Sequence, residues 1–179
     1  MEWTPFYTTM AASAATVIGL LFVAVQLSAE KVAGDHRDRW WAIAFSTFYS
    51  FLTVFFLPLT YLSPALKPHG RAVLTLVLAA VYVFRMAQTS FLIWHGMFRR
   101  KGDRLWETFW NLLGPMFVYI LMGYHASKAL LSGDSSSMDD SISILMAALF
   151  AIALRNSWHL VVEGVFRKQS ERAGWWWRA

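Results

Sequence analysis

The sequence predicts an all-α integral membrane protein, a bundle of five transmembrane helices with the N-terminus outside and the C-terminus in the cytoplasm. Two observations predict this class. Hydrophobic residues make up 57% of the 179-residue chain, and charged residues only 15%. The apolar residues are also concentrated in five stretches of 21 to 23 residues, and about 20 helical residues cross the hydrocarbon layer of a bilayer. A soluble domain of this length cannot bury so much apolar surface.

The five predicted spans are separated by short connectors. In chain order the spans are 8–28, 40–62, 72–94, 109–131 and 142–164. Because no connector is long enough to hold a second domain, residues 1–179 are predicted to form one transmembrane domain. The first span lacks the basic start of a signal peptide, so we expect it to be retained. In the acidic last connector, Asp139, Asp140 and Ser141 are predicted to cap the fifth helix.

The basic residues predict the orientation. Of the 16 Lys and Arg residues, eleven fall in the first connector, the third connector and the C-terminal tail, whereas two fall in the second connector. Cytoplasmic segments carry an excess of Lys and Arg, which places the C-terminus inside. Tryptophans such as Trp40, Trp94 and Trp110 lie near the same ends of the spans, where indole rings anchor at the headgroup level.

Composition and motifs exclude several functions. The chain has no cysteine, which excludes disulfides, thiolate metal sites and thiol nucleophiles. It has no zinc-protease helix, nucleophile elbow or phosphate-binding glycine loop, so neither an enzyme nor a metal site is predicted. The net charge of +5 does not indicate a nucleic-acid partner, because most basic residues flank apolar spans and face lipid headgroups.

Small residues recur on the first span. Ala11, Ala15 and Gly19 are spaced four residues apart and predict a helix-packing face on which another helix can approach closely. This face is either a seam inside the bundle or a contact with another subunit. The first interpretation is favoured because every bundle needs such seams, while a homo-oligomer stays open.

Ionisable residues within the predicted spans are the main functional signal, because they are costly in hydrocarbon. Arg85 and Arg155 each lie two residues past the midpoint of their span, about 3 Å from it. We therefore expect them at matching depth near the midplane, facing the bundle interior or an aqueous cavity. The whole predicted polar site consists of Arg85, Gln88, Arg155, Asn156, His159, Glu163 and Ser50.

Two interpretations of this site remain open. No carboxylate lies at the depth of the arginines, because Glu163 is about 15 Å inward of the centre of its span. The site therefore supports an anion-attracting constriction in a homo-oligomeric channel or transport-type protein. Alternatively, the polar residues only hold helices together in a non-catalytic regulator that binds another membrane protein.

A haem protein is a weaker alternative. His95 and His159 both fall in the cytoplasmic half of the predicted bundle, but their estimated depths differ, and two axial ligands need compatible height. No cofactor is therefore predicted.

The opening segment Phe6–Leu27 and the segment Leu154–Leu160 of the last span resemble a family of small polytopic proteins of the bacterial inner membrane. Some members of that family are labelled modulators of a membrane-bound AAA protease. The resemblance implies a multi-pass protein of the inner membrane and favours the regulator interpretation. It also implies that Gly19 belongs to a packing seam and that Arg155, Asn156 and Trp158 are a polar signature of the last helix.

Overall fold

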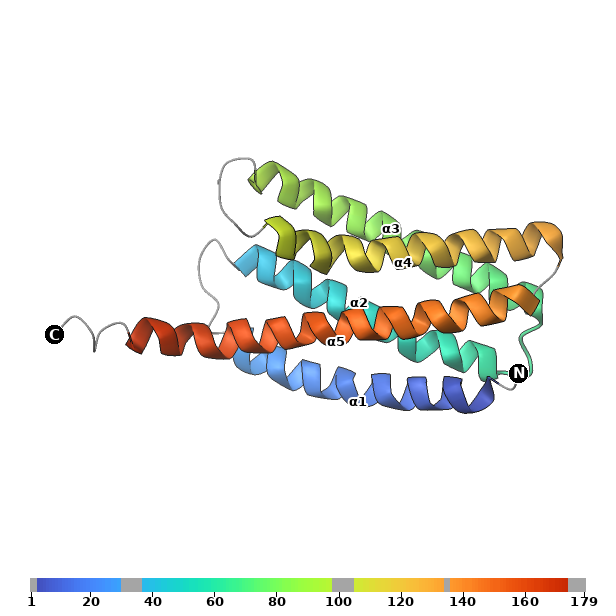
Figure 1. Cartoon of the computed structure of the whole chain (residues 1–179), viewed down its shortest axis with the longest axis horizontal. Helices are drawn as coiled ribbons and strands as arrows, with labels where there is room; N and C mark the ends of the chain where they lie inside the picture. Colours follow the sequence, from blue (N-terminus) through green and yellow to red (C-terminus); the bar gives the residue numbers. More distant parts are fainter. Residues whose placement is uncertain (1–2, 30–36, 98–104, 134–135, 174–179) are drawn as a thin grey trace.

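The structure is a computed structural model that describes residues 3–29, 37–97, 105–133 and 136–173. Within these residues it contains five α-helices (Figure 1). They are α1 (Thr4–Ala29), α2 (Arg37–Leu62), α3 (Pro68–Met97), α4 (Leu105–Ser132) and α5 (Ser136–Ala173). Each predicted span lies within one of these helices, so the all-α prediction is confirmed.

Four helices are long and apolar enough to cross a membrane within the described residues, namely α1, α2, α3 and α5. The chain is therefore a membrane protein. Helix α4 is not among them, and the side chains of its first turns lie outside the described residues. Four of the five predicted spans are therefore long and apolar enough to cross a membrane, while α4 is a bundle helix of similar length.

The junction between α4 and α5 differs from the prediction. Helix α5 begins at Ser136 and has Asp139 in its first turn. None of Asp139, Asp140 and Ser141 is therefore the N-cap residue, so the predicted N-cap position is wrong by a few residues. On the other side of this junction, Gly133 follows the last residue of α4 and ends that helix. Its φ of 70° is a left-handed conformation, and its N–H donates a 3.0 Å hydrogen bond to the Ala129 carbonyl, as at a glycine-terminated helix.

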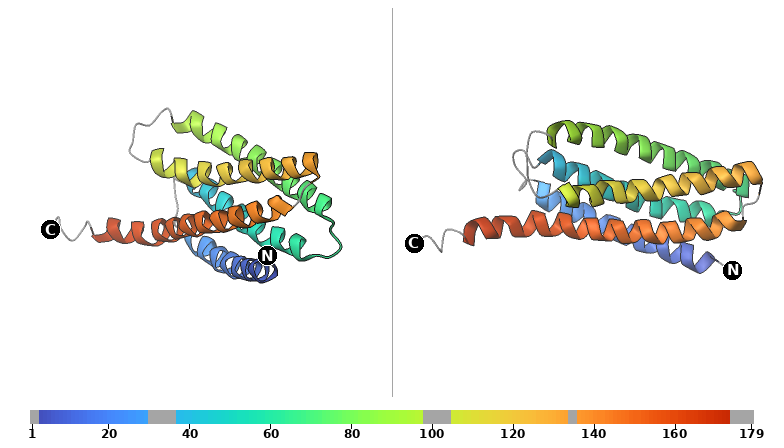
Figure 2. Two further views of the ribbon diagram at one scale, coloured as in Figure 1. Left: turned by 45° about the vertical axis from the view of Figure 1, so that its right-hand side comes forward. Right: turned by 45° about the horizontal axis from the view of Figure 1, so that its top comes forward.

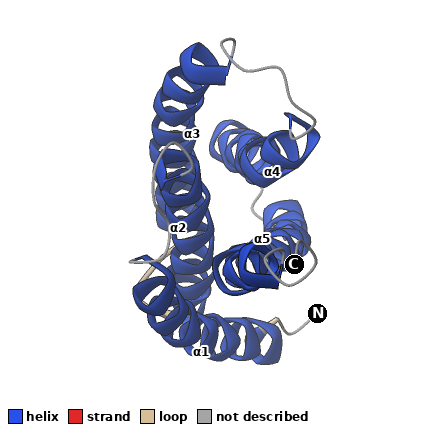
Figure 3. Cartoon of the chain, turned by 90° about the vertical axis from the view of Figure 1, so that its left-hand side faces the viewer, coloured by secondary structure: helices blue, strands red, loops and turns tan. Residues whose placement is uncertain are grey.

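The helices form two layers. Viewed end-on, α1, α2 and α3 make one layer, and α4 and α5 make the other (Figure 3). Helix α2 is central and packs against all four other helices, whereas the described part of α1 contacts only α2 and α5. The helices run side by side along the long axis, and α5 continues beyond the bundle (Figure 2). We call the end where α1 and α5 begin the N-terminal end, and the other the C-terminal end.

The interior is filled by apolar side chains from α2, α4 and α5. Those with no more than 1% exposure include Phe51, Val54, Leu57, Tyr119, Met122, Ile142, Met146 and Leu149. The outer surface is also apolar: Leu20 is 66% exposed, Phe84 63% and Ile144 67%. Large apolar side chains on both faces of a helix are expected where lipid replaces water as the surrounding solvent.

The predicted packing face of α1 is only partly a seam. Ala11 is buried, as predicted, but Ala15 and Gly19 are exposed, and a Cβ added to Gly19 would meet nothing within 4 Å. A step of four residues turns an α-helix by about 40° beyond one full turn, so the stripe winds away from the bundle. Met10 and Ala14 continue the buried face instead. The internal-seam interpretation is therefore wrong for Ala15 and Gly19.

Candidate functional site

Two tyrosines stack at the centre of the bundle. The rings of Tyr82 on α3 and Tyr119 on α4 lie 3.6 Å apart at an interplanar angle of 18°. Both side chains are buried, at 4% and 1% exposure. The stack closes the space where α2, α3 and α4 meet.

Hydroxyl groups of α2 bind both tyrosines. The Tyr119 hydroxyl donates a 2.6 Å hydrogen bond to Thr53 Oγ1, and the hydroxyls of Tyr82 and Ser46 share a 3.0 Å bond. Ser50 lies between them and interacts with both tyrosines. We call these five residues the tyrosine network. The sequence signal for it is Ser46, Ser50 and Thr53 on one face of α2, but the predicted site contained only Ser50.

The tyrosine network is internally satisfied. Ser50 and Thr53 donate to the backbone carbonyls of Ser46 and Tyr49, at 2.9 and 3.0 Å. Thr47, which is also buried, donates to the Ile43 carbonyl at 2.8 Å. Because these hydroxyl protons are engaged within α2, they are not available to bind an anion. Ser50 therefore belongs to an interhelical contact rather than to an ion site.

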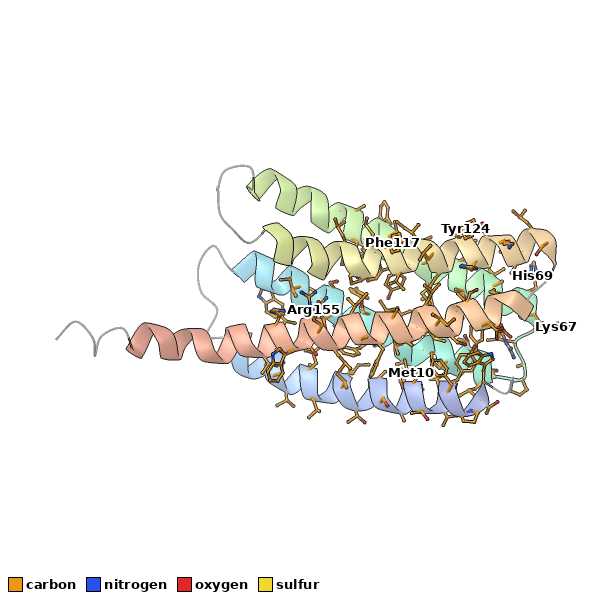
Figure 4. All side chains as sticks on the ribbon, viewed as in Figure 1. Met10, Lys67, His69, Phe117, Tyr124 and Arg155 are labelled. Atoms are coloured by element: carbon orange, nitrogen blue, oxygen red, sulfur yellow. The ribbon has the colours of Figure 1, made fainter. Side chains whose placement is uncertain are left out.

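A second polar group lies on α5 and contains three predicted residues. Asn156 is fully buried, His159 is half-buried and Arg155 is exposed. Residues four apart share a helix face, so Arg155 and His159 are neighbours, and Asn156 lies on the adjoining face. The Arg155 side chain leaves α5 on the side of α2 and α4 (Figure 4). We call these three residues the polar strip of α5.

Contacts at the N-terminal end give the depth of the arginines. Arg71 of α3 and Asp139 of α5 interact electrostatically there. Counted along the helices from these residues, Arg85 lies about 21 Å and Arg155 about 24 Å toward the C-terminal end. The hydrocarbon layer is roughly 30 Å thick. Counted in this way, the two arginines differ in depth by about 3 Å, and both lie between the midplane and the C-terminal boundary.

Arg85 is separate from the polar strip. It is exposed on α3 together with Gln88 and Phe84, and the backbones of α3 and α5 do not approach each other closely within the described residues. The prediction that both arginines face the interior is wrong for the single chain, because the tightly packed tyrosines occupy that space. Glu163 and His95 lie in α5 and α3, but their side chains fall outside the described residues.

Hydrogen bonds join α1, and Trp3 directly before it, to α5 at the N-terminal end. Trp3 Nε1 donates to Asp140 Oδ1 at 2.8 Å, and the hydroxyls of Tyr7 and Ser143 are 3.0 Å apart. Because Ser143 donates to the Asp139 carbonyl at 2.7 Å, Tyr7 supplies the proton to Ser143. We call Trp3, Tyr7, Asp140 and Ser143 the α1–α5 clamp. The clamp was not predicted, although Trp3 and Tyr7 are about one helical turn apart, as are Asp140 and Ser143.

Aromatic and charged groups lie beside the clamp. The ring of Tyr61 is 5.1 Å from that of Tyr7, and the Arg71 guanidinium lies 5.6 Å from the centre of the Tyr61 ring. Arg71 Nε donates to the Leu66 carbonyl at 3.1 Å. The Tyr61 hydroxyl is buried and forms no hydrogen bond that meets standard geometry, although Thr75 is adjacent. This end of the bundle therefore encloses polar groups that are not all satisfied.

The described residues contain no group of three or more His, Asp or Glu side chains able to hold a metal ion. Toward the C-terminal end, α1 and α5 are separated by a shallow apolar groove that has no room for water. The groove is lined by Leu21, Ala24, Val25, Leu160 and Val161. The seam between α1 and α5 is thus polar at the N-terminal end and apolar at the groove.

Comparisons of the chain with models of protein families, with curated proteins and with solved structures give no match.

Proposed function

We propose that this membrane protein is a homo-oligomeric, transport-type protein that attracts anions to the polar strip of α5. One observation carries the proposal: Arg155 is exposed within a helix apolar enough to cross a membrane, beside half-buried His159. A guanidinium in contact with hydrocarbon alone is costly, so water or a second subunit is expected to cover it. In either environment a fixed positive charge favours anions over cations.

The packing favours a path beside α5 over a path through the bundle. The stacked rings of Tyr82 and Tyr119 occupy the space between α2, α3 and α4. Arg85 and Arg155 are exposed on different layers, at depths that differ by only about 3 Å. Copies placed side by side could therefore bring Arg85 of one subunit to the level of Arg155 of the next. This arrangement supports a homo-oligomer with cationic groups between subunits.

Chloride flux into liposomes tests the proposal. Wild-type protein, Arg155→Gln, Arg85→Gln and the double variant are reconstituted at equal density. We expect flux from the wild type and a loss of at least tenfold in Arg155→Gln. Lys128→Gln is the matched control, because it removes one exposed positive charge near the N-terminal end and should leave the flux unchanged. Equal flux in wild type and double variant would overturn the proposal.

A second candidate function is a non-catalytic regulator that binds another membrane protein. The exposed small residues Ala15 and Gly19 of α1 favour it, because another helix can approach closely there. The resemblance to the inner-membrane family, some of whose members are labelled protease modulators, also supports it. The test is affinity purification from native membranes with wild type and Gly19→Leu, with Phe22→Leu as control. A partner lost only in Gly19→Leu is expected, and no stoichiometric partner would contradict this function.

A further inference from the structure

We infer that the α1–α5 clamp is a gate, which closes the N-terminal end of the bundle in this structure and breaks when the protein opens on that side. The inference rests on the proposed function, because a path beside α5 that reaches the polar strip near one end needs a closure along α5 at the other. The clamp lies at the end opposite the polar strip. Its two hydrogen bonds, Trp3 to Asp140 and Tyr7 to Ser143, join helices far apart in the sequence.

The position of α1 makes it the movable element. The described part of α1 packs only against α2 and α5. Along the seam with α5, the clamp provides polar contacts at the N-terminal end, and the buried side chains of Leu21 and Leu160 provide apolar contact farther along. Breaking the clamp therefore releases α1 from α5 at the N-terminal end only, without disturbing the tyrosine network, which joins α2, α3 and α4.

The groups beneath the clamp favour an opening. The Tyr61 hydroxyl is buried and forms no hydrogen bond of good geometry, a state that costs free energy when water is excluded. Arg71 lies over the ring of Tyr61, and Asp139 interacts electrostatically with both residues. Water that entered here would satisfy Tyr61. Polar groups next to the clamp are not needed if the clamp only packs α1 against α5, whereas they are expected if water enters there when the clamp breaks.

Thiol labelling tests the gate directly. The chain has no cysteine, so an introduced cysteine is the single thiol. Met146 is fully buried on α5 just past Ser143. In the Met146→Cys variant, the rate at which the new thiol reacts with a charged, water-soluble thiosulfonate is measured in nanodiscs. The clamp is then removed by combining Trp3→Phe with Tyr7→Phe, which keeps an aromatic ring at each position and deletes both donors. We expect labelling to become at least tenfold faster.

Two controls separate opening from loss of folding. Lys67→Cys is exposed at the same end and should react equally in both backgrounds. Ala153→Cys is fully buried on α5, seven residues further along, and should stay unreactive in both. A gate is overturned if Met146→Cys labels at the same rate with and without the clamp, or if Ala153→Cys becomes reactive together with it. The labelling rate does not depend on transport of an ion, so it tests the gate separately from the proposed function. Labelling that depends on the clamp, together with no chloride flux, would support the gate and overturn the proposed function.

Discussion

The Tyr119 hydroxyl donates a 2.6 Å hydrogen bond to Thr53 Oγ1, which joins α4 to α2 in the interior of the bundle. Thr53 in turn donates to the Tyr49 carbonyl, so its own proton is used within α2. Between helices surrounded by lipid, burial of apolar surface gives little net attraction, and such hydrogen bonds and close packing hold the helices together. The tyrosine network is therefore expected to contribute to stability.

Tyr119→Phe is expected to lower the free energy of unfolding by about 0.5 to 1.5 kcal/mol, because it deletes one buried hydrogen bond. The ring and its stack with Tyr82 remain, and Thr53 keeps its bond to the Tyr49 carbonyl. Chemical unfolding in detergent measures the change. Tyr124→Phe is the matched control, because Tyr124 is on the same helix and 61% exposed. A loss of equal size in both variants would show that the hydroxyl bond itself contributes nothing.

Phe51→Ala is expected to be far more destabilising, by about 3 to 5 kcal/mol, because it leaves a cavity between α2 and α5. Phe51 is fully buried, and its ring lies 5.8 Å from that of Phe150. Phe45→Ala, on the same helix, removes a ring that is 55% exposed and serves as control. Thermal denaturation of both variants gives the comparison, and similar midpoints would contradict the assigned core.

The helices could be predicted from the sequence because five long apolar stretches separated by charged connectors have one simple solution in a bilayer. The direction that each side chain faces could not. In a soluble protein polar residues indicate the surface, but in a membrane bundle apolar residues cover both the core and the lipid face. Arg155 therefore looked like an interior residue in the sequence and is exposed in the structure, whereas Tyr119 drew no attention and is central.

The helix ends were also hard to predict. The acidic residues Asp139 and Asp140 are typical of a cap, but the helix starts earlier, at Ser136. Asp140 instead accepts the Trp3 indole proton across the bundle. Contacts between residues so distant in the chain depend on how α1 packs against α5, which the sequence pattern does not encode. Within the α5 strip, by contrast, helical spacing alone predicted that Arg155 and His159 are neighbours.

Two glycines are expected to respond in opposite directions to alanine. Gly133 has a φ of 70°, where a side chain is strained although nothing lies within 4 Å, so Gly133→Ala should destabilise the protein by about 1 kcal/mol. Gly19 lies within helix α1 and also has open space around it. Gly19→Ala should therefore be neutral or stabilising by up to about 1 kcal/mol in a single chain. Unfolding in detergent tests both, and a stabilising Gly133→Ala would contradict the left-handed turn.

The positive-inside rule predicts that the N-terminal end of the bundle lies outside the cell. Lys67 follows α2 at that end and is exposed, whereas Lys101 lies in a connector that is basic in sequence. Because the chain has no native cysteine, Lys67→Cys and Lys101→Cys each carry a single thiol. In spheroplasts, a membrane-impermeant maleimide should label Lys67→Cys directly and Lys101→Cys only after the membrane is permeabilised. The reverse pattern would invert the bundle, and the polar strip of α5 would then attract anions from outside the cell.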